Sequence, residues 1–127
     1  MSIFRSIKYK LTNFFSEPLS REAFEAYYHR LPNDIEVKWF RDGDFIVGKI
    51  KAGDSEYMTQ GRSADDFVDM VNDSIITVFD IPSSYYDLLR QTHTYLPDGD
   101  QMHKLRNASV KNSVISFEKN EKVVQVA

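Results

Sequence analysis

Cysteine is absent from this 127-residue chain, which excludes disulfide bonds and thiol catalysis. A chain without cysteine fits a reducing compartment, so the cytoplasm is the expected location. With only five glycines and four prolines, the sequence contains no low-complexity tract, internal repeat or linker. No apolar run approaches the roughly 18 residues of a membrane-spanning helix, and no signal peptide is recognisable. The sequence therefore predicts a globular protein with no membrane partner.

An excess of basic charge is also missing. Sixteen Lys and Arg residues stand against nineteen Asp and Glu residues, and the resulting net charge of −3 gives no whole-chain footprint of nucleic-acid binding. Two local basic groups, one around Lys104 and Arg106 and one around Arg5 and Lys8, lack interleaved aromatic side chains on which bases stack. Both groups have the composition of ordinary surface charge, and DNA binding is not expected.

Aromatic residues are abundant, at 13% of the chain, and the length suits one hydrophobic core. The predicted fold class is α+β, in one domain spanning residues 1–127. Within it we distinguish a helical extension (residues 1–33), a core of three strands and a helix (residues 34–91), and a loop with a C-terminal hairpin (residues 92–127).

The N-terminal extension has the apolar spacing of a helical hairpin. A first helix, Met1 to Phe15, carries a long apolar stripe, and a second, Ser20 to Leu31, ends before Pro32. The first helix carries more apolar surface than a lone exposed helix keeps in water. We expect it to be buried on the sheet or across a two-fold homodimer. His29 lies beside the second stripe and is predicted to be structural.

The apolar period then changes to two, which predicts an antiparallel meander of three strands. The strands are expected from Ile35 to Trp39, from Phe45 to Ile50 and from Ser55 to Gln60, separated by turns at Asp42-Gly43 and Gly53-Asp54. Such a meander needs a cover for one face.

A capped amphipathic helix follows the third strand. Ser63 is at the N-cap position and Asp66 at N3, where their side chains satisfy free backbone N–H groups. The predicted apolar stripe, which we expect to cover the meander, comprises Phe67, Met70, Val71, Ile75, Val78 and Phe79. The predicted polar face comprises Asp66, Asp69, Asn72, Asp73, Thr77 and Asp80.

The remaining chain has weaker patterns. Pro82 or Ser83 suits the start of another helix, in which Tyr85, Leu88 and Leu89 share one face. Pro97-Asp98-Gly99 is a turn signal, and residues 101–111 are a loop or a short helix. Two β-rich runs, Ser113 to Phe117 and Lys122 to Val126, predict a closing hairpin.

No pattern of catalytic or metal-binding residues emerges. The three histidines, His29, His93 and His103, lack paired ligand spacing, and Asp42 and Asp54 lie in turns, where aspartate is expected for local hydrogen bonding. We predict no metal, no cofactor, no catalytic residues and no enzyme activity.

The strands from Ile35 onward and the following Thr59 to Phe67 segment, Thr-Gln-Gly-Arg-Ser-Ala-Asp-Asp-Phe, resemble the HicB antitoxin family. The similarity covers roughly residues 35–79, and it implies a partial ribonuclease-H-like fold. The chain departs from the family in three ways. It has no Pro-Gly-Cys segment between the second and third strands, it carries a helical hairpin before the first strand, and it shows no DNA-binding module after Leu89.

The resemblance implies a non-enzymatic, antitoxin-type module that binds and neutralises a small basic ribonuclease toxin of the HicA type. The acidic helix face would steer toward such a partner. The implied partner-binding residues are Thr59, Gln60, Gly61, Asp65, Asp66, Asp69 and Asp73. Three alternatives stay open: an ordinary solvated helix face, a metal-dependent ribonuclease-H-like nuclease, and a structural subunit that assembles through its N-terminal helix.

Overall fold

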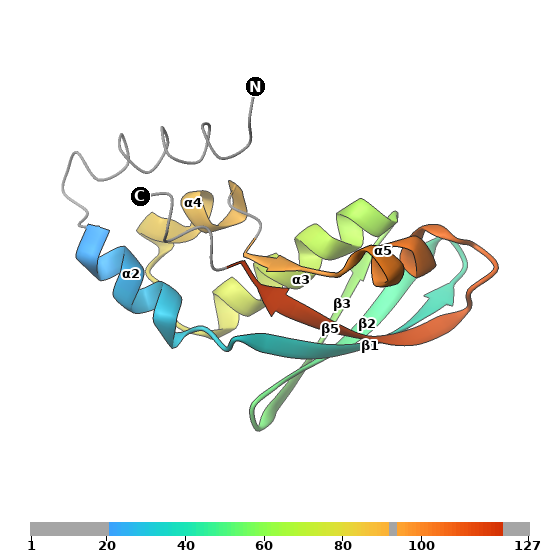
Figure 1. The fold of residues 1–127 in the computed structure, drawn as a ribbon, viewed down its shortest axis with the longest axis horizontal. Coiled ribbons are helices and arrows are strands. Elements are labelled where there is room, and N and C mark those ends of the chain that lie inside the picture. The colour runs from blue at the N-terminus through green and yellow to red at the C-terminus, as the bar shows by residue number, and fades with distance from the viewer. Residues whose placement is uncertain (1–20, 92–93, 121–127) are drawn as a thin grey trace.

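The computed structural model describes residues 21–91 and 94–120, coloured in Figure 1. The predicted first helix, Met1 to Phe15, and the last predicted strand, Lys122 to Val126, lie outside these residues. The described elements, in chain order, are α2 (Arg21–Arg30), β1 (Asp34–Asp42), β2 (Phe45–Ala52), β3 (Ser55–Gly61), α3 (Ala64–Val78), the 3-10 helix η1 (Ser83–Tyr85), α4 (Tyr86–Gln91), β4 (Tyr95–Leu96), α5 (Gly99–Arg106) and β5 (Asn112–Lys119). The α+β class is confirmed.

The strands form one five-stranded antiparallel sheet in the order β3-β2-β1-β5-β4. Its β1-β2-β3 part is the predicted meander, with Asp42 opposite Phe45 and Ala52 opposite Ser55 across two-residue turns. Gly43 and Gly53 begin these turns with φ of +60°, a conformation that glycine adopts without steric cost.

The C-terminal strand differs from the prediction. Instead of forming only a separate hairpin, β5 joins the main sheet beside β1, with Val37 opposite Ile115, and β4 pairs with its end. The predicted three-stranded sheet was therefore too small. The pairing of β1 with β5 joins residues far apart in the sequence, so no local pattern of turn residues predicts it.

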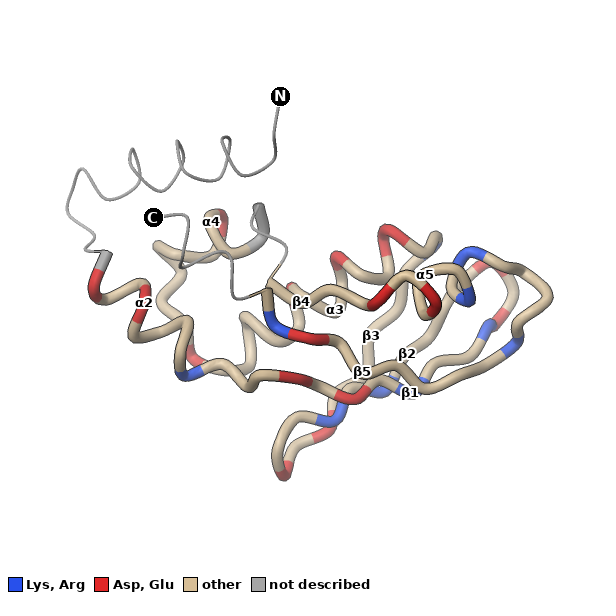
Figure 2. Tube along the Cα trace, viewed as in Figure 1, with Lys and Arg blue, Asp and Glu red and all other residues tan. Residues whose placement is uncertain are grey.

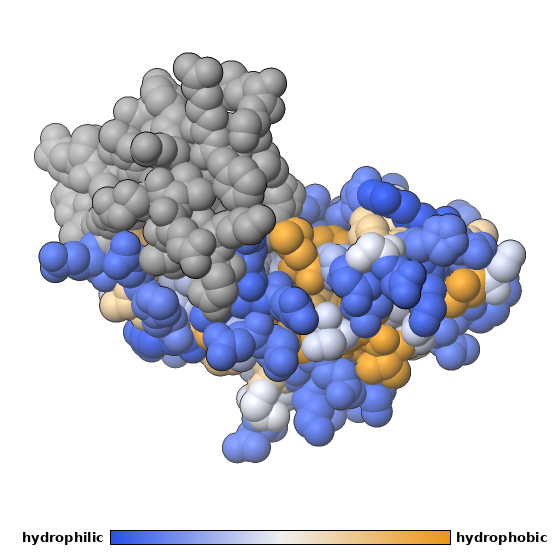
Figure 3. Space-filling view, viewed as in Figure 1, coloured by the Kyte–Doolittle hydropathy of each residue, from blue (hydrophilic) through white to orange (hydrophobic). Residues whose placement is uncertain are grey.

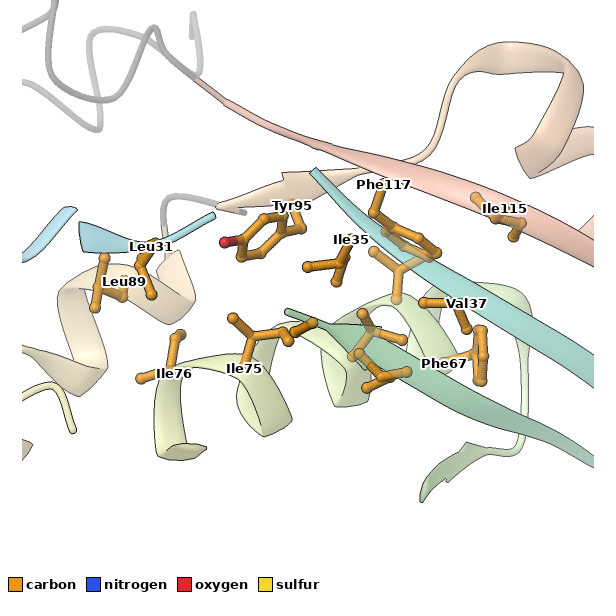
Figure 4. Close-up of a cluster of buried hydrophobic side chains, with 14 of the residues drawn as sticks. Leu31, Ile35, Val37, Phe67, Ile75, Ile76, Leu89, Tyr95, Ile115 and Phe117 are labelled. Carbon is orange, nitrogen blue, oxygen red and sulfur yellow. The ribbon is translucent and has the colours of Figure 1, made fainter. Parts of the chain in front are cut away.

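The helices cover one face of the sheet (Figure 1). Alternate β1 side chains, Ile35, Val37 and Trp39, point into the core and are buried. In Figure 4 the first two lie with Phe117 of β5 above Ile75 of α3. The opposite face of the sheet is open, and its side chains include Phe40 of β1, Met58 of β3 and Val114 of β5, which are 46%, 61% and 52% exposed.

Helix α3 begins as predicted. The Ser63 hydroxyl accepts a hydrogen bond from the Asp66 N–H at 3.1 Å, and the Asp66 carboxylate accepts one from the Arg62 N–H at 2.8 Å. Two assignments of side-chain environment were wrong. Met70 was expected in the buried stripe but is 37% exposed, and Asn72 was expected on the polar face but is buried. The buried stripe is rotated toward β4 and includes Val68 and Ile76.

Two glycines allow α3 to lie close to the sheet. A Cβ atom at Gly48 would stand 2.5 Å from Cζ of Phe67, and one at Gly61 would stand 2.5 Å from the Phe67 backbone nitrogen. Because such distances are far below van der Waals contact, both positions need glycine for packing. The side chain of Phe67 occupies the space above Gly48 and joins helix to sheet.

The other helices close the core at its ends. Tyr85, Leu88 and Leu89 are buried, which confirms the predicted shared face of η1 and α4. His29 is exposed on α2. The buried Lys119 ammonium donates hydrogen bonds to the carbonyls of Tyr28 and Leu31, at the end of α2. None of the helices within residues 21–91 and 94–120 has the length and apolarity needed to span a membrane.

Candidate partner-binding groove

The structure separates the predicted site residues into two groups. Thr59 and Gly61 are buried, so they support the packing of β3 on α3 and offer no side chain to a partner. Gln60 between them is exposed on the open face of the sheet. The four aspartates lie on α3, in the helical layer on the other side of the sheet, so the predicted turn and acidic face do not form one continuous surface.

The four aspartates also differ in their local bonding. Asp66 accepts the Arg62 N–H and so belongs to the helix cap. Asp65 forms an ion pair with Arg106 of α5, with an Nη2 to Oδ1 distance of 3.0 Å. Asp65, Asp69 and Asp73 follow one another at intervals of four residues, which places their carboxylates along the same side of the helix. We call these three residues the acidic stripe, and Figure 2 marks acidic positions along α3 in red.

The acidic stripe borders an open groove of about 500 Å³ between α3, β4 and α5. Apolar side chains from all three elements contribute Val68, Leu96, Pro97 and Met102, and the acidic rim is Asp65 and Asp69. Leu96 is 41% exposed, although it follows a fully buried tyrosine in the same strand. The space-filling view shows apolar surface of this kind interrupting a largely hydrophilic face (Figure 3). We refer to this feature as the α3–β4–α5 groove.

Specific polar contacts hold the walls of the groove in place. Asn72 of α3 hydrogen-bonds both backbone groups of Tyr95 in β4, which fixes the neighbouring Leu96 beside the helix. The Asp98 carboxylate accepts the Gln101 N–H at 2.8 Å and caps α5, which carries Met102. The predicted Pro97-Asp98-Gly99 turn signal therefore marks the start of a helix, since Asp98 is its N-cap.

A second cavity, of about 340 Å³, lies beyond Asp65 and is lined by Arg41, Arg62 and Arg106. These guanidinium groups are largely committed to internal contacts. Arg41 donates to four backbone carbonyls around the end of α5, Arg106 pairs with Asp65, and Arg62 stacks on Phe45 at 5.7 Å. Arg41 and Arg106 thereby link α5 and the segment after it to β1 and α3.

Within the part of the chain that the structure describes, no three His, Asp or Glu side chains converge as a metal site would require. Asp42 and Asp54 lie in or beside the two hairpin turns, and Asp44, in the first turn, lines the 340 Å³ cavity together with Asp65. The groove provides carboxylates on one rim and apolar side chains on its floor. That combination is chemically complementary to a cation carried on an apolar stem, such as an arginine or lysine side chain.

Sequence reasoning missed the apolar half of the groove. Leu96 and Pro97 lie in a stretch with no helical or strand periodicity, so nothing in that stretch predicts a contact with α3. One usable signal was Asn72, since an amide side chain on a rotated helix face can hydrogen-bond a short strand.

Searches of this chain against protein-family models, curated proteins and solved structures find no match.

Proposed function

We propose that this chain is a non-enzymatic protein-interaction module of the HicB-like antitoxin type, which binds a small basic ribonuclease toxin and blocks its activity. The observation that carries the proposal is the α3–β4–α5 groove, in which Asp65 and Asp69 border an apolar floor. A HicA-type toxin is the expected partner because the resemblance of residues 35–79 implies it. Cytoplasmic location and a homo-oligomeric state belong to the same proposal.

The two parts of the groove contribute differently to binding. Apolar contacts with Leu96 and Met102 supply affinity, because both side chains are partly exposed and lose water contact when a partner covers them. The carboxylates of Asp65 and Asp69 attract basic side chains and select against acidic partners. A basic toxin surface that carries one or two apolar residues fits both requirements.

The test uses the full chain and a small basic protein encoded beside its gene. We expect the two proteins to co-purify and the chain to inhibit RNA cleavage by its partner. The double variant Asp65→Lys with Asp69→Lys should weaken binding at least about tenfold, because like charges then face each other. The chain alone, incubated with RNA and Mg²⁺ or Mn²⁺, is expected to leave the RNA intact.

Two control variants separate the groove from general charge effects. The double variant Glu36→Lys with Glu118→Lys makes the same change of charge on the open sheet face and should bind the partner normally. Arg106→Ala breaks the ion pair with Asp65 without adding positive charge at the rim, and it should bind at least as tightly as the wild type. Equal weakening by the Glu36→Lys, Glu118→Lys control and by the groove variant, or RNA cleavage by the chain alone, would contradict the proposal.

A further inference from the structure

Strand β3 forms one end of the sheet order β3-β2-β1-β5-β4, so the strands within residues 21–91 and 94–120 pair with only one of its two edges. The alternation of hydrogen bonds shows which residues face the unpaired edge. In β1, the Arg41 N–H donates to the Lys111 carbonyl beside β5. The backbone N–H and C=O groups of odd-numbered β1 residues therefore point toward β5, and those of even-numbered residues point toward β2. Along every strand, successive residues direct their backbone hydrogen-bonding groups to opposite neighbouring strands. The assignment for β1 therefore fixes the assignment for β2 and then for β3.

Carried through β2, the alternation makes Ser55, Tyr57, Thr59 and Gly61 the β3 residues that bond to β2, opposite Ala52, Ile50, Gly48 and Ile46. The backbone groups of Glu56, Met58 and Gln60 therefore point away from the sheet. Each residue has one N–H and one C=O, so the edge presents six hydrogen-bonding groups. No other described residue forms a hydrogen bond with any of the six.

This edge lacks the features that usually prevent strand pairing. It contains no proline, its only charged side chain is Glu56, and its central residue, Met58, is 61% exposed. Glu56 is itself paired with Lys49 of β2 at 2.9 Å, so its charge is partly neutralised. An exposed, unblocked edge of this length is a template for another strand.

The geometry points to a second copy of this chain as that strand, paired antiparallel with β3 about a two-fold axis at Met58. In this register Met58 bonds its counterpart, and Glu56 bonds Gln60 of the second copy, so all six groups on each edge are satisfied. A shift by two residues in either direction leaves Glu56 or Gln60 without a partner. The register also keeps the two Glu56 carboxylates apart, where direct pairing of like charges would be unfavourable.

The position of Met70 on α3 also agrees with a two-fold axis at Met58. Successive residues of an α-helix are rotated by about 100°, so Met70 and Ser74 lie on the flank of α3 opposite Asn72. Asn72 faces β4, at the other end of the strand order, and the Met70 flank therefore faces the β3 edge. Met70 is the apolar α3 residue left 37% exposed. Pairing of β3 brings this flank toward its counterpart and withdraws Met58 and Met70 from water.

The first experiment exploits the absence of native cysteine. Met58→Cys places a thiol at the proposed axis, and Val114→Cys places one at a similarly exposed position on the open face, on β5. A short bis-maleimide should join two Met58→Cys chains into a covalent dimer and leave Val114→Cys chains single. Light scattering of the wild type at roughly 100 μM should give twice the 14.8 kDa mass of the chain. A monomeric mass, or equal cross-linking at both positions, would overturn the inference.

The second experiment tests the two-fold symmetry. Met58→Lys and Met58→Glu each place like charges against each other at the axis, and each should raise the dimer Kd at least about tenfold. An equimolar mixture should recover the dimer, because lysine then faces glutamate. Circular dichroism verifies that each variant is folded. Variants that stay dimeric alone, or a folded mixture that stays monomeric, would refute pairing at Met58. These outcomes do not depend on toxin binding, which uses the groove on the other side of α3.

Discussion

Asn72 and Tyr95 exchange two hydrogen bonds in the interior: the Asn72 Nδ2 group donates to the Tyr95 carbonyl at 2.9 Å, and the Tyr95 N–H donates to Asn72 Oδ1 at 2.6 Å. The side-chain amide thus pairs with Tyr95 as a neighbouring strand would. Asn72 Nδ2 also donates to the Val68 carbonyl one turn earlier in α3. Asn72 therefore fixes the position of β4 relative to α3, and these two elements form two walls of the groove.

The variant Asn72→Leu tests this link. It leaves both backbone groups of Tyr95 without their partner in a buried site, where each unsatisfied group costs about 1–3 kcal/mol. We expect the free energy of unfolding to fall by about 2–4 kcal/mol in urea titrations. The matched control is Thr77→Ala, which removes an exposed hydrogen bond to the Asp73 carbonyl on the same helix. Its effect should stay within about 0.5 kcal/mol, and equal losses in both variants would contradict the role of Asn72.

A substitution at Gly48 tests the close approach of Phe67. In Gly48→Ala the new methyl group meets the Phe67 ring at 2.5 Å, so either the ring or the helix must move. We expect a loss of about 1–3 kcal/mol, measured by chemical unfolding, and partial recovery when Phe67→Leu is added. Gly99→Ala is the control, since nothing lies within 4 Å of its added methyl group. If the two alanine variants are equally stable, the ring does not constrain Gly48.

The bonding of Arg41 predicts that lysine cannot replace it. Its guanidinium donates to the carbonyls of Lys104, Leu105, Asn107 and Val110, and it lies 5.1 Å from the Trp39 ring. A lysine ammonium has no planar fork with which to reach these acceptors together. Arg41→Lys should lower the free energy of unfolding by about 1–3 kcal/mol.

Hydrogen exchange of the α5–β5 segment locates the effect of Arg41→Lys. Amide exchange should accelerate in residues 104–111 and remain nearly unchanged in β3, at the far end of the sheet. Arg62→Lys is the control, because Arg62 contacts the Phe45 ring but has no side-chain hydrogen bond to this segment. Uniformly faster exchange throughout the protein would contradict a local anchoring role.

The Lys49–Glu56 pair predicts a pH response. A hydrogen bond and the charge of Lys49 hold the pKa of the Glu56 carboxyl below its ordinary value, and the charges of Lys51 and Lys38 lower it further. Because the pKa is lower in the folded than in the unfolded chain, the pair stabilises the fold above the unfolded pKa. That contribution is lost as the pH falls through the folded pKa.

Since Glu56 is exposed, the measurable quantity is its pKa, followed by NMR titration of the side-chain carboxyl. Lys49→Met should raise this pKa toward the ordinary glutamate value. Lys51→Met should raise it less, because Lys51 forms no hydrogen bond with Glu56 and acts by its charge alone. A larger rise in Lys51→Met than in Lys49→Met would show that the hydrogen bond is not the main cause.

Local chemistry in the sequence was enough to predict several elements. Alternating side chains and the glycines at residues 43 and 53 determine the β1-β2-β3 meander, because strand period and turn conformation depend on neighbouring residues. Ser63 and Asp66 determine where α3 begins, since a cap acts within one helical turn. The C-terminal apolar alternation likewise predicts that β5 is a strand, but not where it pairs.

Tertiary structure alone decided the rest, because contacts between distant residues select among faces that the sequence leaves equivalent. The hydrogen bonds between Asn72 and Tyr95 fix the rotation of α3 about its own axis. In this rotation Asn72 is buried and Met70 is exposed. The same rotation places Asp65 and Asp69 beside Leu96 and creates the groove. The insertion of β5 beside β1 leaves β3 at the edge of the sheet, where no described residue hydrogen-bonds its outward backbone groups.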